Sequence, residues 1–125
     1  MKQTTNVILM VRPVGFRMNE QTAVNNYYQQ ELVDTLPATI NAKAQREFDD
    51  LVIKLQNNGV VVIVVDDTET PSTPDSLFPN NWISFHQNGD VALYPMFAEN
   101  RRLERREDVL EILESKGFVI ENIVD

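Results

Sequence analysis

The sequence predicts an α/β fold built from two similar units, each combining strands with one amphipathic helix. Two apolar runs, 7–11 and 60–65, have the continuous hydrophobicity of buried strands. A repeated pattern favours the same class: residues 51–66 (LVIKLQNNGVVVIVVD) and 109–125 (VLEILESKGFVIENIVD) both pass from a helix end through a glycine into an apolar strand and a terminal aspartate. Ordinary alternation of helices and strands in an α/β protein would give the same pattern, so repetition and alternation stay equally open.

The first unit begins with the run Val7–Val11, whose uninterrupted apolar side chains predict a strand buried on both faces. Pro13 ends this strand, because proline cannot donate a hydrogen bond to a strand ladder. Residues 14–40 show no clear periodicity. Within them, residues 19–22 could cap a short helix, and Pro37 would interrupt anything longer.

A helix and a strand complete the first unit. The helix is predicted to run from an N-cap at Asn41 to a C′ residue at Gly59. Its apolar side chains fall at helical spacing on one face: Phe48, Leu51, Val52 and Leu55. Six consecutive β-branched residues, Val60–Val65, then predict a central strand that ends at Asp66.

The second unit follows a loop at 67–76, in which two prolines and several small polar residues leave little to pack. A hairpin is predicted from the strands 82–86 and 91–94, joined by a turn at Asn88 and Gly89. Asparagine followed by glycine is a strong hairpin signal because both residues tolerate positive φ. A second helix is predicted from Leu103 to Lys116, ended by a glycine, and a last strand from Phe118 to Val124.

The composition excludes several classes of function. The 125 residues carry a net charge of −8, which disfavours nucleic acid as a partner. No apolar run approaches the roughly 18 residues of a membrane span, and the apolar stretch near the N-terminus is too short for a signal peptide, so a cytoplasmic location is expected. Cysteine is absent, which excludes disulfides, thiolate metal sites and a cysteine nucleophile within these residues. No cofactor or metal is expected, since there is no phosphate-binding loop, metal-ligand cluster or nucleophile elbow.

The candidate binding residues lie in the stretch 75–82 (DSLFPNNW), between a buried strand and a hairpin. Loops at the carboxyl ends of parallel strands are where α/β proteins bind ligands. Asp75 can accept hydrogen bonds from a cationic guanidinium, and Asn80 and Asn81 offer both amide acceptors and donors. The alternative interpretation is ordinary turn chemistry, because these residue types are also common in loops.

Arg101 and Arg102 precede the second predicted helix, where an arginine could bind a substrate carboxylate through a bidentate fork. The alternative is a solvated basic patch, because further arginines and acidic residues follow at helical spacing. The single histidine, His86, has no recognisable nucleophile partner and is not expected to be catalytic. Asp66 is a weak further candidate because it ends a strand.

Three segments resemble the dimethylarginine dimethylaminohydrolases and, more closely, the bacterial citrulline-utilisation hydrolases of the amidinotransferase superfamily. They are residues 7–13 (VILMVRP), 19–28 (NEQTAVNNYY) and 78–106 (FPNNWISFHQNGDVALYPMFAENRRLERR). The family motif has an aspartate, then Phe-x-Glu-Asp or a variant, an apolar hairpin and an Arg-Arg pair opening a helix. The resemblance spans nearly the whole chain, and the last segment is the specific one.

The resemblance implies a pentein fold of five ββαβ-like modules around a central site, of which this chain would supply two, at about 6–66 and 75–125. It implies nucleophilic attack by a cysteine, with a histidine as acid/base, and both would lie beyond residue 125. His86 does not match the family histidine. Asp75 would match the first substrate-binding acid, Asn80 and Asn81 the Glu-Asp pair, and Arg101 or Arg102 the arginine pair.

The change of two carboxylates to amides is the main departure from the family pattern. A cationic substrate would lose much of its counter-charge, whereas a neutral ureido group such as that of citrulline would suit amides. The expected partner is therefore a small guanidino or ureido amino acid. Self-association through exposed module edges is also expected, because open strand edges and apolar patches favour pairing.

Three hypotheses for the chain follow. It is an N-terminal part of a guanidino- or ureido-modifying enzyme, inactive alone; or it is a stand-alone, non-catalytic module that binds such a compound or assembles with other chains; or it is an unrelated small α/β domain. The third hypothesis would be contradicted by convergence of Asp75, Asn81 and Arg101 or Arg102 in one place.

Overall fold

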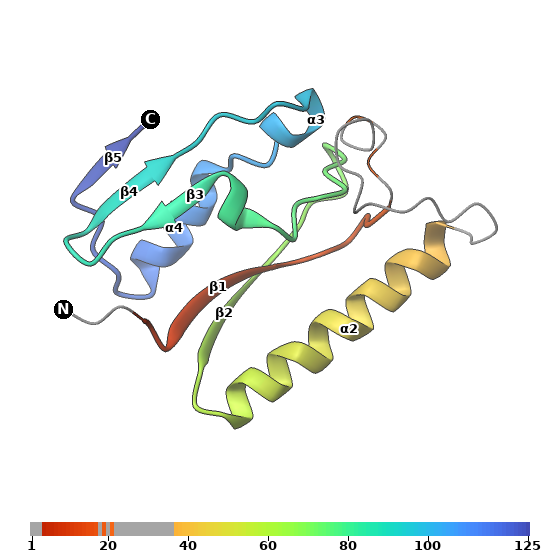
Figure 1. Ribbon diagram of the computed structural model, residues 1–125, viewed down its shortest axis with the longest axis horizontal. Helices are drawn as coiled ribbons and strands as arrows, with labels where there is room; N and C mark the ends of the chain where they lie inside the picture. Colours follow the sequence, from red (N-terminus) through yellow and green to blue (C-terminus); the bar gives the residue numbers. More distant parts are fainter. Residues whose placement is uncertain (1–3, 18, 20, 22–36) are drawn as a thin grey trace.

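Two sheets and the helices packed on them make up the part of the chain that the computed structural model describes, residues 4–17, 19, 21 and 37–125 (Figure 1). The first sheet pairs β1 (Val7–Arg12) with β2 (Val61–Asp66). The second has the order β3 (Ile83–Phe85), β4 (Asp90–Leu93) and β5 (Asn122–Val124). The α/β class predicted from the sequence is confirmed.

In the first unit β1 and β2 run parallel, in register from Val7 opposite Val61 to Arg12 opposite Asp66. The connection between them includes α2 (Pro37–Asn57), which lies along the sheet and packs against β2 (Figure 1). Parallel neighbours require such a crossover. An ion pair of 2.9 Å between Arg12 Nε and Asp49 Oδ1 joins the end of β1 to this helix.

The beginning of α2 differs from the prediction. The helix begins at Pro37 rather than after Asn41, because proline is well suited to a first helical turn, where its missing N–H is not needed. Asn41 therefore lies inside the helix and is not its N-cap. Its side chain accepts a hydrogen bond from Phe16 N (2.8 Å) and donates one to Val14 O (2.9 Å), which fixes the loop after β1.

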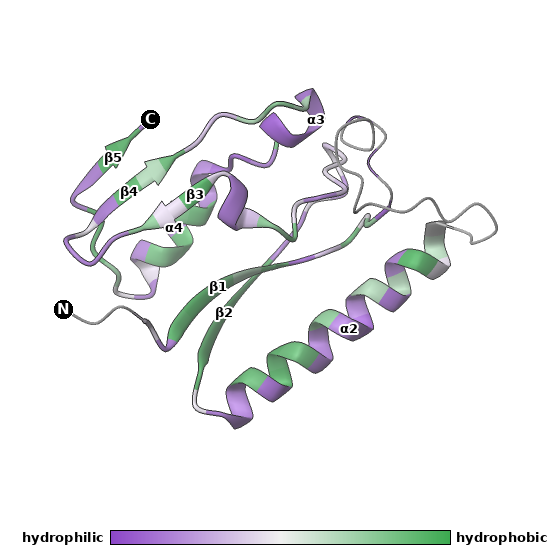
Figure 2. Ribbon diagram, viewed as in Figure 1, coloured by the Kyte–Doolittle hydropathy of each residue, from purple (hydrophilic) through white to green (hydrophobic). Residues whose placement is uncertain are grey.

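The burial of the first sheet also differs from the prediction. Ile63 and Val65 of β2 are buried, whereas Val61 and Val64 are exposed, and in β1 only Val11 is fully buried among the strand residues. β2 is therefore not a central strand with two covered faces. The reason is that each strand of this sheet has a single described neighbour, and α2 covers the outer face only in part. The apolar character of both strands is visible in Figure 2.

The hydrophobic core lies between β2 and the second unit. Its buried members come from both units and pack as one cluster: Ile63, Val65, Trp82, Ile83, Val91, Val109, Leu110 and Leu113. The last three belong to α4 (Glu107–Ser115), whose buried face packs in the same cluster as Ile83 of β3 and Val91 of β4. Burial of side chains of this size contributes about 1.5–3 kcal/mol each, so this cluster holds the two units together.

The second unit has the order strand, strand, helix, strand. β3 and β4 form an antiparallel hairpin, with Ile83 opposite Leu93, and β5 adds parallel to β4, with Ile123 opposite Val91. The turn differs from the prediction: Gly89 has a φ of 90°, but no described residue other than glycine has a positive φ, so Asn88 does not. The hairpin therefore uses a longer loop than a two-residue turn.

The helix predicted at 103–116 is two helices, α3 (Glu99–Arg102) and α4. The chain breaks between them, where Arg106 is extended (φ −108°, ψ 120°), because the charged stretch around it has no continuous apolar stripe. The last strand is also shorter than predicted and is confined to β5. The short helix suggested from residue 19 falls mainly outside the described residues. None of the described helices is long and apolar enough to cross a membrane.

Candidate functional site

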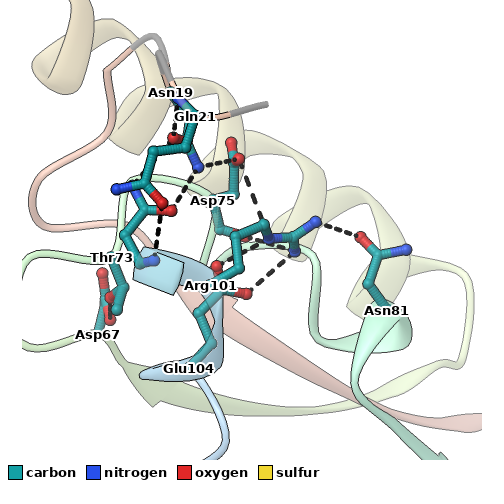
Figure 3. A network of polar contacts seen from close by, with 9 residues as sticks. Asn19, Gln21, Asp67, Thr73, Asp75, Asn81, Arg101 and Glu104 are labelled. Carbon is teal, nitrogen blue, oxygen red and sulfur yellow. Dashed lines mark hydrogen bonds and ion pairs between the residues drawn. The ribbon is translucent and has the colours of Figure 1, made fainter. Parts of the chain in front are cut away.

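A network of polar side chains gathers where the loop after β2 meets α3 and the segment that carries Asn19 (Figure 3). The loop carries Asp75, and the single turn of 3-10 helix Pro79–Asn81 carries Asn81. The short helix α3 carries Asn100 and Arg101. We call these side chains the Asp75 network: Asn19, Asp75, Asn81, Asn100, Arg101 and Glu104.

Arg101 is the centre of the Asp75 network, and all three of its guanidinium nitrogens have partners. Nε and Nη2 donate to the two carboxylate oxygens of Glu104 at 2.9 and 3.0 Å, a bidentate fork. Nη1 donates to Asn81 Oδ1 at 3.1 Å, and Nη2 also approaches the carbonyl oxygen of Asp75 at 3.4 Å. Asp75 Oδ2 lies 4.0 Å from Nε. The predicted loop residues therefore do surround a planar guanidinium, and it belongs to the chain itself.

Asp75 is held from its other side by an asparagine pair. Asn19 is completely buried and donates to Asp75 Oδ2 at 2.8 Å. Asn19 and Asn100 also exchange two hydrogen bonds between their amides, at 2.9 and 3.0 Å. Asn100 N in turn donates to Gln21 Oε1 at 3.0 Å. These contacts fix the Asp75 carboxylate to both the N-terminal segment and α3.

Burial controls the electrostatics of the Asp75 network. The Glu104 side chain is 1% exposed and that of Arg101 is 13% exposed. Burial raises the pKa of the Glu104 carboxyl above its usual value, even though Arg101 acts in the opposite direction, and the charges of Asp75 and Asp67 raise it further. Arg101 is therefore the positive charge that allows the carboxylates of Glu104 and Asp75 to lie close together in a partly buried position.

The base of the loop is closed by a second contact. Asp67 is buried, accepts a hydrogen bond from Thr73 Oγ1 at 2.8 Å and donates its own N–H to Arg12 O at 2.9 Å. Arg106 Nη1 donates to the carbonyl oxygen of Asp66 at 2.9 Å. The Asp66 side chain is exposed and stays outside these contacts. The loop is thus fixed at both ends, which holds Asp75 in place.

The predicted site residues do not all meet. The described hydrogen bonds of the Arg102 side chain lie outside the network, where it donates to the backbone oxygens of Met96 and Phe97, both at 3.0 Å. Asn80 is exposed and lines a groove of about 1010 Å³ between β1 and the β3–β4 hairpin, whereas Asp75, Asn81 and the two arginines are not among its lining residues. His86 lies on the hairpin within 3.1 Å of Ser84 Oγ, and Ser84 is also within 2.9 Å of Tyr94 Oη.

Three members of the network were not among the predicted site residues: Asn19, Asn100 and Glu104. Glu104 follows Arg101 by three residues, and such spacing on a helix also describes a solvated pair of little energetic consequence. Asn19 contacts a residue 56 positions later in the chain, which no local pattern indicates. Among the described residues no group of three or more histidine, cysteine, aspartate or glutamate side chains could hold a metal ion.

Comparison with known families gives a match over most of the chain. The family model described as N,N dimethylarginine dimethylhydrolase, eukaryotic, matches residues 12–125. No curated protein and no solved structure matches the chain. The match contradicts the hypothesis of an unrelated small α/β domain and confirms the resemblance to the dimethylarginine dimethylaminohydrolases. The chain belongs to the dimethylarginine dimethylhydrolase family, within the amidinotransferase (pentein) superfamily.

Proposed function

We propose that this chain supplies the part of a guanidino- or ureido-modifying hydrolase that binds the substrate, and that the substrate is a ureido amino acid of the citrulline type. The observation that supports this most directly is the position of Asp75 and Asn81 beside the Arg101 guanidinium. Asn81 Oδ1 accepts a hydrogen bond from it, and the carbonyl oxygen and the carboxylate of Asp75 lie 3.4 and 4.0 Å from its nitrogens. Acceptor groups that surround one planar, nitrogen-rich group are suited to another of the same shape. Family membership supports the reaction class.

Asp75 is proposed to bind an NH2 group of the substrate. Its Oδ2 is taken by Asn19, while Oδ1 has no hydrogen bond to any residue that the structure describes. Next to it, Ser76 Oγ is buried and also lacks a partner within the described chain. Buried polar atoms in native proteins are nearly always bonded, so an unsatisfied hydroxyl here is what a site for a polar ligand would leave.

Arg102, rather than Arg101, is proposed to bind the substrate carboxylate. The Arg101 guanidinium is fully engaged with Glu104, Asn81 and the Asp75 backbone. Arg102 is exposed, and its two bonds go to neutral backbone oxygens, with no acidic partner among the described residues. A carboxylate would exchange those neutral acceptors for a charged one, and charge-assisted bonds are about twice as strong.

The attacking group is proposed to come from outside these 125 residues, since the sequence contains no cysteine. In the family reaction a thiolate adds to the guanidino or ureido carbon, and the tetrahedral intermediate then expels its leaving group with the help of an acid/base. The chain alone is therefore proposed to bind and not to turn over its ligand. This also fits the second hypothesis, a non-catalytic binding module.

Turnover and binding can be tested on the purified chain. We expect no release of ammonia or methylamines from arginine, citrulline or methylated arginines. Heteronuclear NMR titration with citrulline should shift the amides around Asp75, and Asp75→Asn should weaken binding at least tenfold. Asp66→Asn is the matched control, because Asp66 is an exposed acid outside the network. Turnover by a sample that contains only this chain, or equal binding by Asp75→Asn and the control, would refute the proposal.

Self-association is proposed to occur through the outer edge of β5. Val119, Ile123 and Val124 are exposed there, at 70%, 54% and 58%, and β5 has β4 as its single described neighbour. An edge of this kind presents free backbone groups beside apolar side chains, which favours strand pairing. Analytical ultracentrifugation should detect dimers that Ile123→Lys abolishes. A strict monomer at high concentration would contradict the idea.

A further inference from the structure

The two units of the fold share one arrangement of strands and helix. In each unit a strand is followed by a helix and then by a second strand that pairs parallel to the first: β1, α2 and β2 in one, β4, α4 and β5 in the other. On its other edge β4 also has an antiparallel neighbour, β3. Within the described part of the chain β1 has β2 as its single neighbour, so the edge of β1 that corresponds to the β3 side of β4 is open.

The backbone hydrogen bonds show which residues of β1 face this open edge. The strand donates none of its even-numbered carbonyl groups to solvent at its two ends: Val61 N donates to Asn6 O at 2.7 Å. At the other end Asp67 N donates to Arg12 O at 2.9 Å, so the even-numbered residues face β2. Because successive residues of a strand direct their N–H and C=O groups to opposite edges, those of Leu9 face the open edge.

The open edge is partly capped by a side chain. Thr5 Oγ1 accepts a hydrogen bond from Val7 N at 3.1 Å and donates one to Val7 O at 3.3 Å. The hydroxyl thus bonds Val7 as the backbone of a neighbouring strand would. For Leu9, two residues further along, no hydrogen bond at this edge joins it to any described residue. Backbone groups of this kind are a template for another strand.

The open edge borders the groove of about 1010 Å³ between β1 and the β3–β4 hairpin, and apolar side chains line most of it. Across from the β1 residues 7–10, its apolar lining residues include Ile83, Phe85, Leu113 and Ile120. A segment extended along β1 could pair with Leu9 and place alternate side chains in this groove. The groove is separate from the Asp75 network, because Asp75, Asn81 and Arg101 do not line it.

Charge restricts what the groove can hold. Asp90 is the one permanently charged side chain among the described residues that line it. Hydrogen bonds from Asn122 and Asn88 lower the pKa of Asp90 below its usual value, so this carboxyl is ionised at neutral pH. A lone carboxylate beside an apolar groove favours an occupant that carries a lysine or an arginine.

We propose that the open edge of β1 binds an extended segment of a partner polypeptide as an added antiparallel strand, with apolar side chains in the groove and a basic residue beside Asp90. The direction and the pattern follow from β3, which is antiparallel to β4 at the corresponding edge and reads Ile83-Ser84-Phe85. Backbone bonds to Leu9 contribute affinity, and the groove and Asp90 select the side chains. This site is distinct from the proposed substrate site.

The test uses the unaltered chain and a peptide with blocked ends, Lys-Thr-Ile-Ser-Phe-Thr-Lys, whose centre repeats the pattern of β3. Amide hydrogen exchange followed by NMR measures single residues of β1. In the free chain the Leu9 amide should exchange faster than those of Ile8 and Met10, which face β2. With the peptide at about 100 times its dissociation constant, exchange at Leu9 should slow about 100-fold.

Two N-methylated peptides distinguish strand addition from adhesion to an apolar surface. One is methylated on every second backbone nitrogen and the other on the remaining nitrogens, so a single one of them keeps its N–H groups toward β1. The other should bind about tenfold more weakly, because a backbone acceptor of β1 is left unpaired. Equal affinities of the two peptides would overturn strand addition.

The role of charge is tested by Asp90→Asn, which should weaken binding of the lysine peptide about two- to fivefold. A peptide with glutamine in place of both lysines should bind Asp90→Asn and the unaltered chain equally. Glu111→Gln is the matched control, because Glu111 is an exposed carboxylate outside the groove. An equal affinity of the lysine peptide for Asp90→Asn and Glu111→Gln would overturn the choice of a basic occupant.

The same exchange measurement decides between occupants of the edge. Slow exchange at Leu9 in the dilute chain without peptide would overturn the proposal, because the edge would then be covered already. Protection of Leu9 that appears without peptide as the chain concentration rises would overturn the partner polypeptide and identify a second copy as the occupant. Unchanged exchange at Leu9 with saturating peptide would overturn binding at this edge.

Discussion

Replacing Arg101 by methionine should be among the most destabilising single changes in the second unit. Methionine keeps much of the apolar stem but removes both hydrogen bonds to Glu104, whose side chain is 1% exposed, and the bond to Asn81. Breaking a buried ion pair from one side costs about 3–5 kcal/mol, because the remaining charge stays buried without its partner. We expect a loss of that size in the free energy of unfolding near pH 8.

The loss should depend on pH, with a sign that follows from Glu104. Burial already raises the pKa of this carboxyl above 4.5, and Arg101 is the group that lowers it. Without Arg101 the folded-state pKa rises further, so the folded variant binds a proton that the unfolded chain releases. Stability then falls as pH rises through the interval between the unfolded and folded pKa values. The deficit of Arg101→Met should therefore be largest at alkaline pH and shrink as pH falls toward 4.5.

Urea denaturation followed by the fluorescence of Trp82 measures this effect, because Trp82 is the single tryptophan and is 2% exposed. Arg102→Met is the matched control, because it removes the same charge from the adjacent position. Arg102 is exposed and forms no ion pair with a described residue. The control should lose less than about 1 kcal/mol. The reasoning is refuted if Arg101→Met and the control are equally stable near pH 8, or if the deficit of Arg101→Met grows as pH falls.

Three further changes have expected outcomes. Gly59→Ala and Gly89→Ala both place a side chain at positive φ, 84° and 90°, which costs about 1–2 kcal/mol of folding stability. Gly89→Ala should cost more, because its new Cβ would lie 2.6 Å from a side-chain carbon, whereas the new Cβ of Gly59→Ala would meet nothing within 4 Å. The midpoints of urea denaturation measure the difference between the two variants. Asn41→Ala removes both hydrogen bonds to the loop after β1 and should lower the free energy of unfolding by about 1–3 kcal/mol, measured by urea denaturation. A hydrogen bond from the arginine at the end of β1 lowers the pKa of Asp49 below its usual value of 3.8. The ionised Asp49 therefore stabilises the fold above pH 3.8, and this contribution disappears as pH falls through the folded-state pKa. In an acid titration of unfolding, Asp49→Asn should lack that part of the transition.

Elements that depend on local patterns were predictable from the sequence. The continuous apolar runs identified β1 and β2, and the glycines identified the ends of α2 and α4. The burial of β2 was not predictable, because a run of β-branched residues is the same for a strand covered on one face or on two. The beginning of α2 was not predictable either, since Asn41 suits an N-cap and instead bonds a loop 25 residues earlier.

The Asp75 network was predictable in some of its residue types and not in its contacts. Asp75 and Asn81 were candidates because polar side chains follow a predicted buried strand, and Arg101 and Arg102 were candidates because they precede a predicted helix. Which arginine enters the network depends on the short α3 and the break after it, and no sequence spacing decides that. The segment that carries Asn19 contacts α3 through Asn100, a hydrogen bond between residues 81 positions apart, which no local pattern indicates.

The Asp75 network carries one negative charge that its own members do not neutralise. Arg101 and Glu104 neutralise each other in their fork, so Asp75 is left as the one excess negative charge within the network. A carboxylate at Asn81 would add a second negative charge beside it, whereas the amide adds none and accepts a hydrogen bond from Arg101. Because Arg101 is the cation on which Glu104, Asn81 and Asp75 all converge, a variant that removes it should disturb all three contacts together and lower the free energy of unfolding.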